Sequence, residues 1–140
     1  MKDINNPLIK AYYDAIAATG FPVYEGEEPD NELSKLYVVI SDVTSSDAST
    51  KNSTDVSAQI QITVNSWELK YNNSKALNTA AGVILEAIKP DPNAVLDLSG
   101  AGMQMLNLSV QNDRLQNYGK LAGRVYISRQ IIFNQSIFIY

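Results

Sequence analysis

The sequence contains no cysteine and no histidine among its 140 residues. The lack of cysteine excludes a disulfide framework and a thiolate nucleophile. The lack of histidine excludes a Ser-His-Asp triad and a histidine pH switch, and together the two absences exclude Cys/His zinc sites. The chain also has no uninterrupted apolar run of about 18 residues, and its N-terminus lacks the apolar core of a signal peptide. We therefore expect no membrane partner and a soluble protein that stays inside the cell that makes it.

What is present is typical of one globular domain over residues 1–140. Hydrophobic residues make up 45% of the chain and charged residues 19%. The net charge is −4, which disfavours specific nucleic-acid binding because that affinity depends on cationic side chains. The charge is unevenly spread: residues 1–50 carry three basic and nine acidic side chains, whereas residues 101–140 carry four and one. The chain is acidic at its front and basic at its back.

Hydrophobic periodicity predicts an α+β fold. Apolar residues recur at helical spacing over residues 7–19 and 74–89, with Asn6 as the expected N-cap of the first helix. Alternating or β-rich runs predict strands at residues 21–24, 36–40, 59–66, 106–111 and 125–133, with residues 112–119 as the connection between the last two. Helices do not alternate with strands along this order, so we expect a mostly antiparallel sheet with two helices packed on one face.

A polar stretch, VTSSDASTKNSTDVS at residues 43–57, separates two of the predicted strands. It has almost no apolar area whose burial could offset the entropy lost on ordering. The sequence therefore predicts a long mobile loop at residues 43–57, flanked by two antiparallel strands.

Five carboxylates gather after the first short strand, and they are the strongest candidates for chemistry: Glu25, Glu27, Glu28, Asp30 and Glu32. Paired carboxylates can hydrolyse glycosides or hold Ca²⁺. The run lacks EF-hand spacing, and a glycosidase would need an aromatic-lined cleft on a larger scaffold. We interpret the cluster as a solvated loop or a polar contact surface, and we expect no metal and no cofactor. A small hydrolase using Glu25 or Glu27 is the less favoured alternative.

Two features near the C-terminus depart from simple one-sided alternation. Arg129 falls on the apolar face of the last predicted strand, which calls for a bulge, an edge position or a salt-bridge partner. The uncharged end, Ser136-Ile137-Phe138-Ile139-Tyr140, would promote aggregation if it were left exposed. It either folds back on its own sheet or adds to a neighbouring subunit, and the sequence leaves both open.

The pattern over nearly the whole chain resembles the tail terminator, or tail-completion, proteins of tailed bacteriophages, with relatives in prophages and gene transfer agents. A helix ending in Thr19-Gly20-Phe21-Pro22-Val23-Tyr24 precedes Leu36-Tyr37-Val38-Val39-Ile40. The alternating strand Ile60-Gln61-Ile62-Thr63-Val64-Asn65-Ser66-Trp67 and the helix opening at Tyr71-Asn72-Asn73-Ser74-Lys75-Ala76 follow. The stretch from Trp67 to Tyr71 is the most specific part of the likeness, and residues 137–140 depart from it.

The resemblance implies a non-enzymatic structural protein of the virion. Such subunits form a ring, commonly a hexamer, that caps the head-proximal end of the tail tube, stops its growth and joins it to the neck. The implied partners are other copies of the chain, the tail-tube protein and a neck or head-completion protein. Assembly would occur in the bacterial host cytoplasm, and the protein would reside at the tail-neck junction. The alternatives are a head-tail connector or a tail-tube subunit.

The charge distribution suggests how such a ring would close. We expect the acidic front around Glu25, Glu27, Glu28 and Asp30 of one subunit to meet the basic back around Arg124 and Arg129 of the next. Burial of Ile137, Phe138, Ile139 and Tyr140 against the neighbour would then hold the contact.

Overall fold

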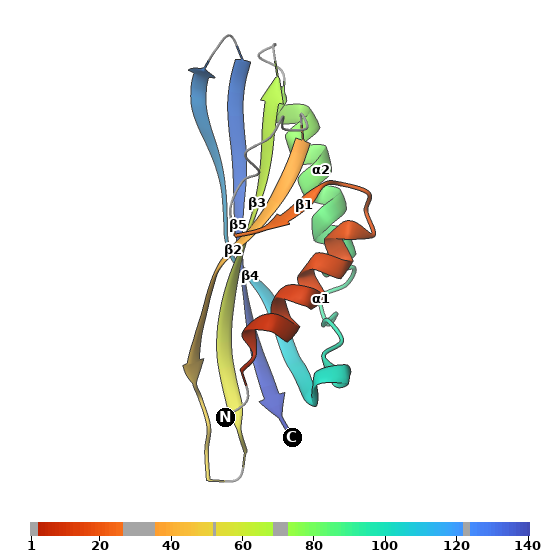
Figure 1. The fold of residues 1–140 in the computed structure, drawn as a ribbon, viewed down its shortest axis with the longest axis vertical. Coiled ribbons are helices and arrows are strands. Elements are labelled where there is room, and N and C mark those ends of the chain that lie inside the picture. The colour runs from red at the N-terminus through yellow and green to blue at the C-terminus, as the bar shows by residue number, and fades with distance from the viewer. Residues whose placement is uncertain (1–2, 27–35, 52, 69–72, 122–123) are drawn as a thin grey trace.

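The chain folds into a five-stranded sheet with two helices on one of its faces (Figure 1). The computed structural model describes residues 3–26, 36–51, 53–68, 73–121 and 124–140. The elements in chain order are α1 (Asn5–Ala17), β1 (Val23–Glu25), β2 (Leu36–Asp47), β3 (Asp55–Glu68), α2 (Asn73–Ile88), a short 3-10 helix (Ser99–Ala101), β4 (Met103–Leu121) and β5 (Arg124–Ile139). The predicted α+β class is confirmed.

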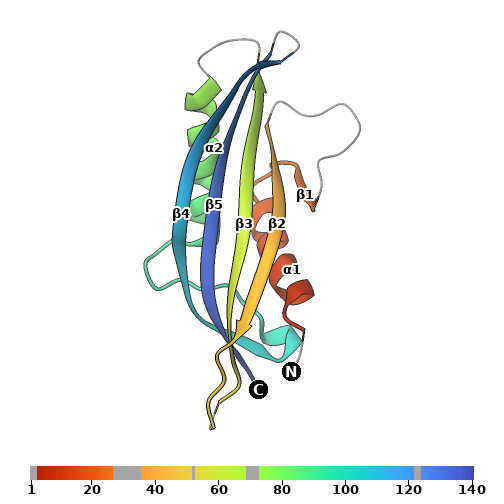
Figure 2. The same ribbon diagram turned by 90° about the vertical axis from the view of Figure 1, so that its left-hand side faces the viewer.

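The strands lie in the order β1-β2-β3-β5-β4. The short β1 pairs in parallel with β2, and the remaining neighbours are antiparallel. Both helices cover one face, which we call the helix face, and the other, the open face, is visible in Figure 2 in front of the helices. β3 and β5 are the inner strands, hydrogen-bonded on both sides along most of their length, whereas β2 has a second neighbour only at residues 38–40 and β4 is an edge strand.

The core lies between the helices and the helix face of the sheet. α1 contributes Leu8, Tyr12 and Ile16. The apolar residues of α2 and of the inner strands complete it, among them Leu77, Ala81, Ile84, Ile88, Ile60, Ile62, Val64, Ile131 and Phe133. Full burial of one such large side chain contributes about 1.5–3 kcal/mol, so this alternation on β3 and β5 fixes their register against the helices.

The first helix begins slightly earlier than predicted. It starts at Asn5, and Ile4 takes the N-cap position in place of Asn6. The Asp3 carboxylate accepts a hydrogen bond of 2.9 Å from the Asn5 N–H and so binds one of the free donors at this end. Pro7 falls in the first turn, where its missing N–H costs nothing.

The polar stretch at residues 43–57 is mostly strand, so the predicted loop is too long. β2 continues to Asp47 and β3 begins at Asp55, and Thr44, Ser45, Ser46 and Asp47 pair with Gln59, Ala58, Ser57 and Val56. The outer part of β2 is exposed, so it needs no apolar residues, and the backbone ladder alone holds it. Whether this stretch is mobile stays a prediction.

The predicted connection at residues 112–119 is also strand. β4 runs to Leu121 and pairs with β5 throughout, with Asn112 opposite Ile132 and Gly119 opposite Tyr126. Residues 111–115 of this edge strand are exposed, so its sequence shows no one-sided alternation there.

Candidate functional site

The acidic cluster is only partly placed. Glu25 is the last residue of β1, opposite Ile40 of β2, and its side chain is exposed. Glu27, Glu28, Asp30 and Glu32 lie outside the described residues. Glu25 therefore stands at one edge of the sheet, where a solvent-facing carboxylate can serve as a contact group.

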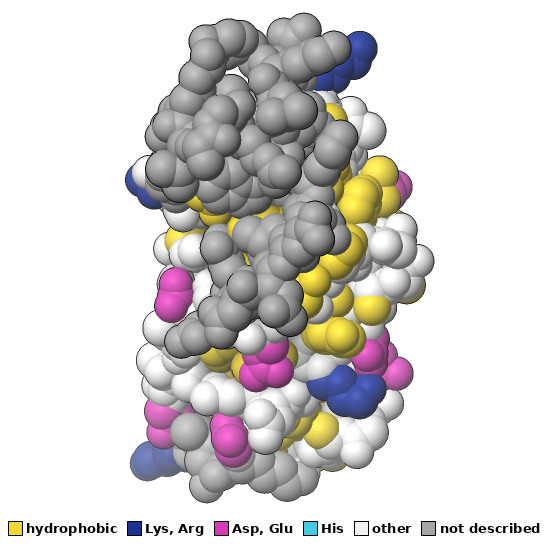
Figure 3. All heavy atoms as spheres, turned by 45° about the horizontal axis from the view of Figure 1, so that its top comes forward, with side chains coloured by type: hydrophobic (Ala, Val, Ile, Leu, Met, Phe, Trp, Pro, Cys, Tyr) yellow, Lys and Arg dark blue, Asp and Glu magenta, His cyan; other side chains and the backbone are white. Residues whose placement is uncertain are grey.

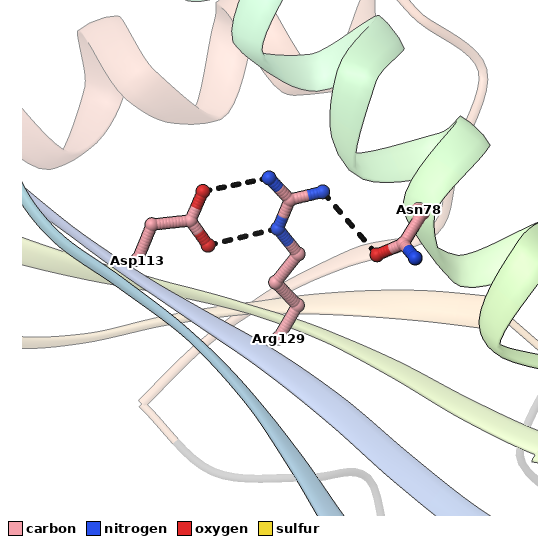
Figure 4. Close-up of polar contacts among 3 residues, drawn as sticks. All are labelled: Asn78, Asp113 and Arg129. Carbon is pink, nitrogen blue, oxygen red and sulfur yellow. Dashed lines mark hydrogen bonds and ion pairs between the residues drawn. The ribbon is translucent and has the colours of Figure 1, made fainter.

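Arg129 is the centre of a polar cluster that joins three elements (Figure 4). Its Nε donates to Oδ1 of Asp113 on β4 at 2.8 Å, and its Nη2 donates to Oδ2 at 2.6 Å. Its Nη1 reaches Oδ1 of Asn78 on α2 at 3.4 Å. Of the three possibilities raised by its place on the apolar face, the structure shows the salt-bridge partner, and this partner lies in the same subunit.

The geometry of this ion pair favours a strong local contact. The guanidinium engages the carboxylate through two parallel hydrogen bonds, an arrangement specific to arginine. The side chains of Arg129 and Asp113 are 21% and 30% exposed. The hydrogen bond to Asp113 raises the pKa of Arg129, although partial burial opposes the shift. Arg129 thus has its charge balanced internally and ties β5, β4 and α2 together.

Arg124, the second basic residue expected at a subunit contact, is the first residue of β5. It pairs with Leu121 of β4, at the end of the sheet where the chain passes from β4 to β5. The structure describes the backbone of Arg124 but not its side chain. The structure does not bring Arg124 and Arg129 to one point: they are separated along β5, and Arg129 contacts α2 through Asn78.

The apolar C-terminus is part of the subunit's own sheet. β5 runs to Ile139 between β3 and β4, with Ile137 opposite Val56 and Met105. Ile137 and Ile139 are buried in the core, whereas Phe138 is half-buried on the open face and Tyr140 is 62% exposed. Of the two possibilities left by the sequence, the structure shows the first. The Phe138 and Tyr140 rings, 5.9 Å apart, are the parts of this end that face outward.

A buried polar network below α1 was not predicted from the sequence. The Tyr12 hydroxyl donates to Oε1 of Gln135 at 2.5 Å, and Nε2 of Gln135 donates to the Ala58 carbonyl at 2.8 Å. Gln135 is fully buried, and burial raises the pKa of Tyr12 well above its usual value. Continuing the alternation of β5 past Phe133 would have placed Gln135 on the helix face. A buried amide there needs a hydrogen-bond partner, so the sequence could have indicated this network.

The two faces of the molecule differ in chemistry. The open face carries amides and hydroxyls with few charges, as in the row Gln59, Asn134 and Ser109 across three strands. On it, the Tyr126 hydroxyl donates to Oδ1 of Asn65 at 2.6 Å. The helix layer exposes apolar side chains, Tyr13 and Val83 among them, and Figure 3 shows hydrophobic side chains gathered on that side of the molecule.

Within the described ranges, no three Asp or Glu side chains converge as a metal site would require. No helix in these ranges combines the length and apolar content needed to cross a membrane.

Comparison with known proteins gives a likeness in fold. No protein-family model matches the chain, and no curated protein matches its sequence. A solved structure described as the virion of a native gene transfer agent particle contains a chain that superposes with a TM-score of 0.72. The two are 16% identical, and the match covers 99% of each chain. At this identity the likeness establishes a shared fold over the full length.

Proposed function

We propose that the chain is a structural virion protein that forms a ring on the head-proximal end of a phage tail tube, ends tail polymerisation and joins the tail to the neck. The observation that carries the proposal is the full-length likeness to a chain of a gene transfer agent virion. The resemblance of the sequence to tail terminators supports the specific role of a ring that ends the tail tube. The protein acts through its surfaces, with no catalytic step and no cofactor.

The sheet edges suggest how neighbouring subunits meet. Glu25 lies on the edge strand β1, and Arg124 lies on β5 opposite Leu121 of β4, the strand at the other edge. A head-to-tail ring brings unlike edges together, so an acidic group on one edge can face a basic group on the next subunit. Arg129 is paired with Asp113 of its own subunit and remains a proposed contact residue on the basic side.

Exposed ion pairs contribute only about 0–1 kcal/mol each, so charge orients the subunits and apolar contact holds them. The exposed Tyr140 and half-buried Phe138 are the C-terminal side chains available for that contact. Ile137 and Ile139 support them from the core. The tail-tube protein and a neck or head-completion protein are the other partners.

Negative-stain microscopy and mass measurement of the purified protein test this function. A terminator gives closed rings of fixed mass, expected to be hexamers, and added rings stop the elongation of tail-tube protein. Long tubes formed by the chain alone would identify a tail-tube subunit, and a ring that leaves tube growth unaffected would favour a head-tail connector. Turnover that Glu25→Gln abolishes would contradict a structural role.

A charge reversal tests the proposed contact. Glu25→Lys places like charges at the joint and is expected to weaken or slow ring formation, most clearly at low salt. Glu86→Lys is the matched control because Glu86 is an exposed residue of α2, away from the sheet edges. Equal assembly of the two variants would contradict the role of Glu25.

A further inference from the structure

The outer edge of β4 has the features of a strand that other chains could pair with. β4 spans 19 residues at the edge of the sheet. Its first part, residues 103–112, contains no charged side chain, and Leu106 and Val110 are 50% and 41% exposed. A long, uncharged edge with exposed apolar side chains is a template for pairing with another chain unless it is protected.

Two features of the structure oppose such pairing. The register of β4 against β5 shifts at three places, between Met105 and Asn107, between Val110 and Asn112, and between Asn117 and Gly119. Each irregularity interrupts the regular ladder that a new strand would follow. Between the first two shifts remains a regular stretch, residues 107–110.

Lys89 acts on this regular stretch. It directly follows α2, its side chain is half-buried, and its Nζ donates a hydrogen bond to the backbone carbonyl of Leu108. A strand that docked here would have to compete with an ammonium group for that carbonyl and bury the charge beside the new ladder. Burying a charge without a partner is costly, so the cation disfavours the docked state.

We propose that Lys89 keeps the outer edge of β4, at residues 107–110, from pairing with a strand from a second copy of the chain. This goes beyond the proposed ring, because it identifies a residue that excludes one way of joining subunits at this edge, namely backbone pairing. Neighbouring subunits then meet at this edge through side chains, without a continuous backbone ladder.

Lys89→Met tests this inference because it keeps the apolar stem of the side chain and removes the ammonium. The matched control is Lys75→Met, which removes the same charge from an exposed position near the start of α2. Light scattering and thioflavin fluorescence of the full chain are followed with time. We expect Lys89→Met to raise the rate of strand-mediated growth about tenfold or more over Lys75→Met, with Lys89→Arg close to the unaltered protein.

A second variant separates edge pairing from a weaker helix end, since a cation near the C-terminus of a helix also stabilises that helix. Leu106→Lys, introduced with Lys89→Met, returns a charge to the β4 edge without restoring the one beside α2. Suppression of growth in the double variant supports the proposal. Growth that persists there, or a Lys89→Met protein as soluble as Lys75→Met, overturns it.

These readouts are independent of the proposed function. Ring formation is judged from the mass of the unaltered protein, which is finite. Edge pairing is judged from the difference in growth rate between Lys89→Met and Lys75→Met. Unlike a ring, a product of edge pairing grows without limit.

Discussion

β5 and β4 are hydrogen-bonded to each other over nearly their whole length, yet they are built differently. From Ile131 to Ile139, every second side chain of β5 is buried under the helices. β4 follows that pattern only as far as Leu108, and residues 109–115 are exposed on both faces. The inner strand is held by side-chain burial and by two ladders, whereas the second half of the edge strand is held by one ladder and by polar contacts.

The difference explains which strands are visible in the sequence. Apolar and polar residues alternate along a strand when one of its faces is buried. The alternation is absent where neither face of the strand is buried. A strand can still form there because its backbone groups pair with a neighbour that is itself fixed. The comparison predicts that substitutions on β5 cost much more stability than equivalent substitutions on β4.

The largest difference is expected between Phe133→Ala and Leu115→Ala. Phe133 is fully buried on β5 and packs against Tyr12 at a ring distance of 5.4 Å, whereas Leu115 on β4 is 50% exposed. Phe133→Ala removes a large core side chain and should lower the free energy of unfolding by about 3–5 kcal/mol. Leu115→Ala should change it by about 0.5 kcal/mol or less. Urea titration measures both, and similar midpoints would contradict the contrast between the strands.

A smaller loss is expected at the buried amide of β5. Gln135→Met leaves the Tyr12 hydroxyl and the Ala58 carbonyl without their partner and should cost about 1–3 kcal/mol. Adding Tyr12→Phe removes the hydroxyl, one of the two groups left unpaired. The double variant should therefore lose less stability than the sum of the two single losses. Asn134→Ala, next along the strand on the open face, is the control. Strict additivity in urea titrations would show that Tyr12 and Gln135 do not act as a pair.

The sequence predicted what depends on one-sided burial. It identified both helices, the inner strands and the order of elements, because their apolar residues are regularly spaced, as in Leu77, Ile84 and Ile88. It shortened β2 and β4 because their outer parts are polar on both faces. Pairing with a distant strand, such as Asp113 opposite Ile131, leaves no local signal.

The candidate site was also predicted only in part from the sequence. The place of Arg129 on an apolar face predicted a bulge, an edge position or a salt-bridge partner, but the identity of Asp113 depends on a register that the sequence does not reveal. Gln135 was accessible to the same reasoning and was missed because the alternation was not continued past Phe133.

The ion pair between Arg129 and Asp113 links the inner and the edge strand, so it should matter more than a pair on the surface. Arg129→Met should cost about 1–2 kcal/mol, because it removes two charge-assisted hydrogen bonds from a site that remains partly exposed to solvent screening. The comparison is Lys10→Met, whose salt bridge to Asp14 joins side chains that are 76% and 59% exposed. We expect a change of about 0.5 kcal/mol or less there. Equal losses in the two variants would show that partial burial adds nothing to this pair.

The smallest free energies belong to local opening of the edges, which amide hydrogen exchange measures. Amides of β4 at residues 112–116 and of β2 at residues 44–47 should exchange faster than those of β3 at residues 60–64, since exposed edge segments open without disturbing the core. Within the stretch 43–57, predicted to be mobile in the free subunit, amides that donate into the β2–β3 ladder should exchange more slowly than those at residues 49–51. Binding of a partner such as the tail tube should slow exchange across this stretch. Core-like protection of residues 44–47 in the free protein would show that the outer part of β2 is as firmly held as the inner strands. The difference in stability between the exposed half of β4 and the buried β5 would then not extend to β2.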